Sequence, residues 1–181
     1  MEQVPLDFLG ELRRTHDCGA LRAGDAGKRA ILMGWVHRRR DLGGVLFIHL
    51  RDREGVTQLV FRSDGDPAVH ARAELLGSEY VIAVEGLVER RAADTVNAAI
   101  ATGEVEVVVD KIWILNTSKT PPFPMEENVD VKEDARLKYR YVDLRRPHMQ
   151  RNIILRSKMT FAVLRSTSSK RDVFCNSRRA S

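Results

Sequence analysis

Residues 45–51 read Val-Leu-Phe-Ile-His-Leu-Arg, and the side chains of this stretch alternate in character with a period of two. Leu46 and every second residue after it are aliphatic and point one way, which predicts a β-strand with one face in a core. The alternation puts an aromatic ring, Phe47, on the opposite face together with His49 and Arg51. This stretch therefore predicts a strand whose outer face carries an aromatic ring beside polar and cationic groups.

Four further runs are rich in Val, Ile, Leu and aromatic residues, and turn signals such as Gly43-Gly44, Glu54-Gly55 and Thr102-Gly103 bound the strands. The five predicted strands are Ala30–Arg38, Val45–Arg51, Val56–Phe61, Tyr80–Glu89 and Val105–Leu115. Between the third and fourth lies a predicted helix over 66–76, in which Asp66 is suited to cap the first turn and Pro67 to occupy the first helical position.

Three strands, a helix and two more strands is the order of elements in an OB barrel. A fragment of a β-sandwich would give the same number of short strands, and the intervening helix favours the barrel. The sequence thus predicts a mainly β fold, a five-stranded OB-fold Greek-key barrel with a helix between strands three and four. A linker and a short helical stub are expected to follow it.

The charge distribution divides the chain of 181 residues, which has a formal net charge of +5. Residues 136–181 carry 13 Lys and Arg against 2 acids, whereas residues 1–135 carry 17 basic and 23 acidic side chains. We predict an OB domain over 1–116, a Pro-rich and acidic linker over 117–135, and a basic third region over 136–181. Within that region we expect a helix over about 149–166 and no regular structure over 166–181.

Several classes of protein and site are not expected. The two cysteines, Cys18 and Cys175, and the scattered histidines have no metal-ligand spacing, so we predict neither a disulfide framework nor a metal site. No apolar run is long enough for a membrane span, and the N-terminus does not resemble a signal peptide. We find no phosphate-binding loop and no complete catalytic constellation, and we expect a cytoplasmic protein without catalytic residues of its own.

The consecutive arginines Arg38, Arg39 and Arg40 are the first candidates for binding nucleic acid. We expect them at the end of the first strand, at the rim of the barrel. The planar guanidinium can make two parallel hydrogen bonds to a phosphate, so this triplet is suited to a polyanion. The alternative is a solvated basic turn.

Phe47, Gln58 and Glu106 are candidates for contacting bases. An exposed ring such as Phe47 can stack on an unpaired base, although it can equally pack under a neighbouring loop. An amide and a carboxylate can hydrogen-bond to base edges. The alternative for Glu106 is the solvated side of a strand, since it lies between two valines.

Five blocks of this sequence resemble bacterial aspartate–tRNA ligases, class II aminoacyl-tRNA synthetases. The blocks are 34–41 (Gly-Trp-Val-His-Arg-Arg-Arg-Asp), 47–55 (Phe-Ile-His-Leu-Arg-Asp-Arg-Glu-Gly), 102–107 (Thr-Gly-Glu-Val-Glu-Val), 119–124 (Lys-Thr-Pro-Pro-Phe-Pro) and 136–147 (Arg-Leu-Lys-Tyr-Arg-Tyr-Val-Asp-Leu-Arg-Arg-Pro). The resemblance spans about 14–164, and the last block is especially specific to the family. It implies that residues 1–116 are the anticodon-binding domain and that 136–181 begin a class II catalytic domain.

The resemblance also implies roles for single residues. Phe47 corresponds to the ring that stacks on the middle anticodon base, and Gln58 and Glu106 to residues that contact anticodon bases. The basic contacts to the anticodon arm correspond to Arg38, Arg40 and Arg91. Leu42 stands where relatives that also charge tRNA(Asn) often have histidine, which favours an aspartate-only parent enzyme.

The resemblance fades after about Leu164, where the family continues into its catalytic domain. We therefore expect a chain truncated before that domain, which binds the anticodon stem-loop of tRNA(Asp) but does not itself catalyse. The full-length family uses ATP and Mg²⁺ to attach aspartate to tRNA and forms homodimers. The alternatives are a stand-alone tRNA-binding module and a general single-strand-binding OB module.

Overall fold

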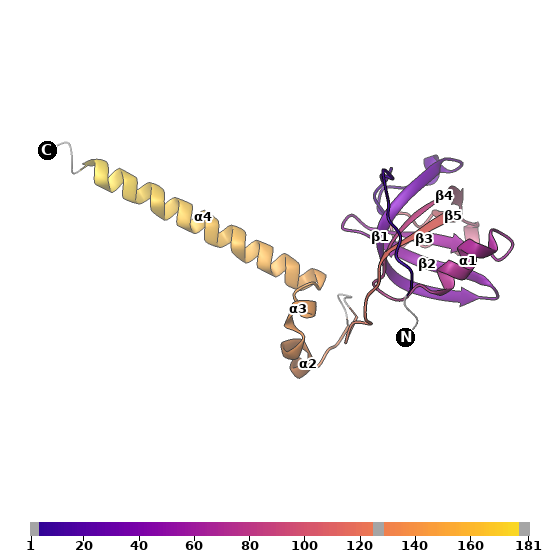
Figure 1. Ribbon diagram of the computed structural model, residues 1–181. Coiled ribbons are helices and arrows are strands. Elements are labelled where there is room, and N and C mark those ends of the chain that lie inside the picture. Colours follow the sequence, from indigo (N-terminus) through magenta and orange to yellow (C-terminus); the bar gives the residue numbers. More distant parts are fainter. Residues whose placement is uncertain (1–3, 125–128, 178–181) are drawn as a thin grey trace. The chain divides into compact units, whose positions relative to one another are not determined.

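A computed structural model describes residues 4–124 and 129–177 of the chain, with side chains described as far as Ser166 (Figure 1). The chain divides into two compact units, Met1–Thr120 and Pro121–Ser181.

The first unit is built on five strands, as the sequence predicts. They are β1 (Arg29–Leu42), β2 (Val45–Arg51), β3 (Val56–Phe61), β4 (Val81–Arg90) and β5 (Val105–Asn116). The order around the sheet is β1-β2-β3-β5-β4, and β4 pairs with β1 so that the barrel closes. All pairings are antiparallel except that of β3 with β5. The prediction of an OB-type barrel is confirmed.

The alternation of β2 determines which of its faces is buried. Leu46, Ile48 and Leu50 are at most 1% exposed and belong to the single hydrophobic core of the barrel. Phe47 and His49 between them are only partly buried, and neither belongs to that core. The outward direction predicted for Phe47 is therefore confirmed.

Strand β1 is longer than predicted, and the three arginines lie within it rather than at its end. It continues to Leu42, and Gly43 and Gly44 then make the turn to β2 with φ values of +62° and +88°. Both glycines have positive φ, as the tight two-residue hairpin turn requires. Arg38–Arg40 therefore pair with β2, which is itself paired with β3 at these positions.

A β-bulge in β1 sets the direction of these arginines. The register with β2 shifts between Val36 and Arg38, so one extra residue is accommodated there. Beyond the bulge, Arg38 pairs with His49 and Arg40 pairs with Phe47, whereas Arg39 pairs with the core residue Ile48. Because paired residues share a face of the sheet, Arg38 and Arg40 point outward and Arg39 points to the other side.

The predicted helix is α1 (Pro67–Glu74), which packs against β2, β3 and β5 (Figure 1). The Asp66 carboxylate accepts a hydrogen bond of 2.8 Å from the Ala68 backbone N–H, so the predicted cap is present. Two 3₁₀ turns, η1 (Ala23–Asp25) and η2 (Ala93–Thr95), lie in the connections.

The second unit contains three helices, α2 (Glu133–Lys138), α3 (Arg140–Asp143) and α4 (Pro147–Ser177). The Asp143 carboxylate is fully buried and receives Arg136 at 3.1 Å and Arg140 at 2.7 Å. Burial raises the pKa of Asp143, but its hydrogen bond with Arg136 and the nearby arginine charges outweigh burial and lower the pKa below its ordinary value. The buried Asp143 carboxylate thus joins an arginine of α2 to an arginine of α3.

The prediction for the end of the chain is wrong over 166–177, where α4 continues. The stretch 167–177 has no proline or glycine, so no residue in it interrupts a helix that begins at Pro147. Residues 178–181, also predicted to lack regular structure, lie outside the described residues. No helix within the described chain combines the length and apolar character needed to cross a membrane.

Candidate nucleic-acid interface

Two rows of side chains cross the outer face of the barrel at β1, β2 and β3. The Phe47 row consists of Arg40, Phe47 and Val60, which are paired across the three strands. The neighbouring His49 row consists of Arg38, His49 and Gln58. Directly opposed residues on neighbouring strands lie about 5 Å apart at Cβ, so each row is a set of adjacent side chains.

The Phe47 row combines an aromatic ring with a cation. Phe47 is partly exposed and outside the core, and its β1 partner Arg40 is exposed. A ring in this position can stack on a base, and a guanidinium beside it can contact the adjoining phosphate. The structure therefore brings together Phe47 and Arg40, two of the residues predicted to bind nucleic acid.

The His49 row continues into a polar cluster of Gln58, Glu106 and Arg91. The Gln58 Nε2 donates a hydrogen bond of 3.0 Å to the Glu106 Oε2, and the Arg91 Nε lies 3.6 Å from the same oxygen. Glu106 reaches Gln58 because β3 and β5 are paired, although the two residues are 48 positions apart in the chain. Gln58 and Glu106, two of the three residues predicted to contact bases, thus form one cluster with Arg91.

Arg91 is the least satisfied member of this cluster. Its side chain is only 10% exposed, and its Nε and Nη1 atoms are buried without a hydrogen-bond partner in the described chain. Unpaired buried donors are costly, and an arginine is among the residues least often buried without partners. Arg91 therefore lies beside the Glu106 carboxylate with two buried guanidinium nitrogens that make no hydrogen bond within the described chain.

His49 is a residue of this surface that the sequence analysis did not select. Burial lowers the pKa of its imidazole below the ordinary value of 6.5, as do the charges of Arg40, Arg38 and Arg91, while a side-chain hydrogen bond with Gln58 acts in the opposite direction. His49 is consequently neutral at pH 7. The sequence did contain a signal for His49, because the alternation along β2 places it on the same outward face as Phe47.

Arg39 is placed apart from the rows. Its Nη1 donates to the backbone carbonyl of Glu74 at 2.9 Å and to that of Leu76 at 3.3 Å. These carbonyls lie at the C-terminal end of α1, where a cation is favourable. Arg39 thus fastens α1 to β1, and the structure does not bring it together with Phe47.

Metal binding is not indicated by the described side chains. Among residues 4–124 and 129–166, no group of three or more His, Cys, Asp or Glu could hold a metal ion. Cys18 is buried in the barrel core as a free thiol.

Comparison with known proteins gives these residues a family. Residues 30–115 match the OB-fold nucleic acid binding domain family that is named for the tRNA anticodon. The chain is 54% identical over 158 residues to the aspartate–tRNA(Asp/Asn) ligase of Desulfotalea psychrophila, and 57% identical over 154 residues to that of Geotalea uraniireducens. The barrel belongs to the anticodon-binding OB domains of aspartate–tRNA ligases. All seven residues predicted to bind tRNA lie within the region that matches the OB-fold nucleic acid binding domain family.

The ligase relatives are much longer than this chain. The alignments cover 87% and 85% of the chain, but the chain spans only about a quarter (26%) of the length of either curated relative. Both relatives are named for tRNA(Asp) and tRNA(Asn) together. The aspartate-only preference inferred from Leu42 stays a prediction.

Solved synthetase structures share the fold of this ligase barrel. The asparaginyl-tRNA synthetase of Pyrococcus horikoshii, complexed with asparaginyl-adenylate, aligns with 75% of this chain and 30% of its own, at a TM-score of 0.61 and 26% identity. The aspartyl-tRNA synthetase of Entamoeba histolytica aligns with 88% of this chain and 38% of its own, at a TM-score of 0.70 and 18% identity. The second comparison supports the fold alone.

Proposed function

We propose that the barrel binds the anticodon loop of tRNA(Asp) through the Phe47 row, the His49 row and the cluster beside them, as part of an aspartate–tRNA ligase. The observation that carries this proposal is that a partly exposed ring, Phe47, lies one row away from the Gln58–Glu106 hydrogen bond on the outer face of the barrel. An unpaired base offers a face that the ring can stack on and an edge that the amide and the carboxylate can bind.

Each residue has a role in this proposal that follows from its chemistry. Phe47 stacks on a base, worth about 1–3 kcal/mol. Gln58 and Glu106 contact base edges, since a carboxylate accepts from exocyclic amines and an amide both donates and accepts. Arg38 and Arg40 contact phosphates from the exposed C-terminal part of β1.

Arg39 has a different role in the proposal from the one that the sequence alone predicts. Its bonds to the carbonyls of Glu74 and Leu76 occupy its guanidinium on the side facing α1. We therefore assign its main effect to the stability of the barrel, and only an indirect, long-range effect to attraction of RNA.

The proposal extends to the longer protein. In the family, the reaction joins aspartate to tRNA with ATP and Mg²⁺, in a cytoplasmic homodimer. Because the chain spans 26% of the length of its relatives, we expect the 181 residues alone to show no aspartate-dependent exchange of pyrophosphate into ATP. An exchange assay on the purified chain checks this, and exchange above the no-aspartate control would contradict it.

Filter binding with two transcripts tests the RNA-binding proposal. Wild-type chain is titrated with tRNA(Asp) and with the same tRNA carrying a substituted anticodon, and tRNA(Asn) serves to measure how strict the preference is. We expect tighter binding of tRNA(Asp) than of the substituted copy at every salt concentration. Equal affinities would overturn the proposal.

A general single-strand-binding function is the second candidate, favoured by the exposed ring and the flanking cations of an OB barrel. It predicts similar affinity for all unpaired RNA, together with steep salt dependence. An unstructured oligonucleotide added to the same titration separates the two candidates, since only the general binder retains it as tightly as tRNA(Asp).

A further inference from the structure

We infer that His49 is a positioning residue that fixes the orientation of the Gln58 amide and thereby sets the base selectivity of the interface. This inference rests on the proposed function, because it concerns how the same surface distinguishes one anticodon from another. His49 acts through Gln58 and is not itself assigned a contact with RNA.

The geometry connects the two residues directly. His49 and Gln58 are paired across β2 and β3, so their side chains are adjacent on the outer face, and an interaction with Gln58 acts to raise the pKa of His49. This interaction favours the charged imidazolium, as expected when the histidine donates and the amide oxygen accepts. At its other end, the Gln58 Nε2 donates to Glu106. The amide nitrogen is therefore directed toward β5, and His49 is the neighbour on β2 that is placed to donate to the amide oxygen.

The orientation of this amide decides what a base encounters. A glutamine amide presents an acceptor at one end and two donors at the other, and rotation by half a turn exchanges them. Such an exchange would reverse the pattern that Gln58 offers to a base edge. A fixed amide is thus a condition for selectivity.

Glu106 alone is a weak anchor for the amide once RNA is bound. The Glu106 side chain is 18% exposed, and in the proposed complex its carboxylate also accepts from a base. The hydrogen bond from Gln58 then competes with that base for Glu106. His49, in contrast, is paired with Gln58 from β2, and in this inference it is the donor that keeps the amide oxygen in place.

The surroundings suit a histidine that donates one hydrogen bond without carrying a charge. The cations near His49 are Arg38 and Arg40 from β1 and Arg91 beyond β4, and burial with these charges lowers the pKa of the imidazole. A neutral imidazole has a single N–H, and the Gln58 oxygen selects which nitrogen carries it.

The test measures base selectivity as the dissociation constant for anticodon-substituted tRNA divided by that for tRNA(Asp). Substitutions at His49 are compared in the wild-type chain and in a chain that also carries Gln58→Met. We expect His49→Ala to lower this ratio about 3- to 10-fold, which corresponds to one hydrogen bond. His49→Gln keeps an uncharged N–H donor and should restore most of the ratio. In a Gln58→Met background, His49→Ala should change the ratio no further.

His70→Ala is the matched control, because His70 is a partly buried histidine on α1 that contacts the Gly44 carbonyl at 3.0 Å, away from Gln58. It should leave the ratio unchanged. An unchanged ratio in His49→Ala, or an equal loss in the Gln58→Met background, would overturn the inference. The second result would mean that His49 reads the base itself.

A measurement without RNA separates this inference from the proposed function. In nuclear magnetic resonance spectra of the free chain, the two Gln58 side-chain amide protons should give distinct, dispersed signals that collapse toward the values of solvent-exposed amides in His49→Ala. Dispersed signals that persist in the variant would contradict the positioning role. A wild-type chain that shows no preference between the tRNAs would instead contradict the proposed function.

Discussion

Replacing Phe47 tests the stacking role most sharply, because the ring can be removed with little disturbance of the core. Phe47 is partly exposed and outside the barrel core, whereas its neighbours Leu46 and Ile48 are fully buried. Full burial of such a side chain is worth about 1.5–3 kcal/mol, so truncation of a partly exposed one should lower the free energy of unfolding by about 1 kcal/mol.

The cost to binding should be larger than the cost to folding. Stacking of one base on an aromatic ring contributes about 1–3 kcal/mol, so Phe47→Ala should raise the dissociation constant for tRNA(Asp) about 5- to 150-fold. Phe47→Leu keeps aliphatic packing against Val60 but removes the aromatic face, and we expect it to lose most of the same affinity.

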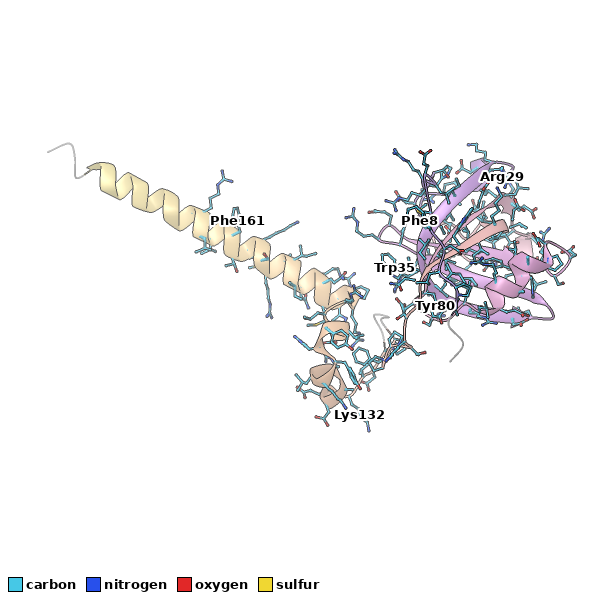
Figure 2. All side chains as sticks on the ribbon, viewed as in Figure 1. Phe8, Arg29, Trp35, Tyr80, Lys132 and Phe161 are labelled. Carbon is cyan, nitrogen blue, oxygen red and sulfur yellow. The ribbon has the colours of Figure 1, made fainter. Side chains whose placement is uncertain are left out.

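Filter binding measures these affinities, with thermal unfolding as the check that each variant is folded. Phe8→Ala is the control, since Phe8 is 92% exposed in the N-terminal segment (Figure 2) and outside both rows. It should bind as the wild type does. Wild-type affinity in a folded Phe47→Ala variant would refute the stacking role.

Three further predictions concern the neighbours of Phe47. Arg40→Ala should weaken binding of cognate and substituted tRNA alike and reduce the slope of log affinity against log salt by about 1; an unchanged slope in a salt titration would argue against a phosphate contact. Arg39→Ala should lower the free energy of unfolding by about 1 kcal/mol in a urea titration, through its lost bonds to α1, and leave the salt slope nearly unchanged; a slope reduced as in Arg40→Ala would contradict this. Because the pKa of His49 is lowered in the fold, the unfolded chain binds a proton that the folded chain excludes, and the free energy of unfolding should decrease as pH falls below about 6.5. Urea titrations at a series of pH values check this, and an identical pH dependence in His49→Gln would count against it.

Most of the barrel could be predicted because its signals are local. The period of β2, the Gly43-Gly44 turn and the Asp66-Pro67 start of α1 are each encoded within a few residues, and all three are present in the structure. The predicted bounds of β2 and β3 agree with the structure at both ends. Local propensity and tertiary packing favour the same structure in these segments.

The faces of Arg38, Arg39 and Arg40 could not be predicted from local sequence signals. Without the bulge between Val36 and Arg38, strict alternation from the outward-facing Trp35, which is exposed on the barrel surface (Figure 2), would direct Arg39 outward and Arg38 and Arg40 inward. The bulge reverses this assignment. An extra residue absorbed by strand pairing leaves no periodic trace in the sequence, so the faces of these arginines required the structure.

The polar cluster depends on long-range pairing. Glu106 reads in sequence as the solvated side of a strand between two valines, and only the pairing of β3 with β5 shows that it meets Gln58. Arg91 follows the end of β4 and has no periodic signal, so its candidacy came from family resemblance, whereas its burial and unpaired nitrogens come from the structure. His49 escaped selection because its importance depends on Gln58.

Chemical-shift mapping of the ¹⁵N-labelled chain during titration with the anticodon stem-loop of tRNA(Asp) tests the central claim most directly. We predict that the largest shifts occur at Arg40, Phe47, His49, Gln58 and Glu106, and that they are reduced for a stem-loop with a substituted anticodon. Shifts confined to the basic second unit, or spread equally by both stem-loops, would contradict the claim that this face of the barrel reads the anticodon.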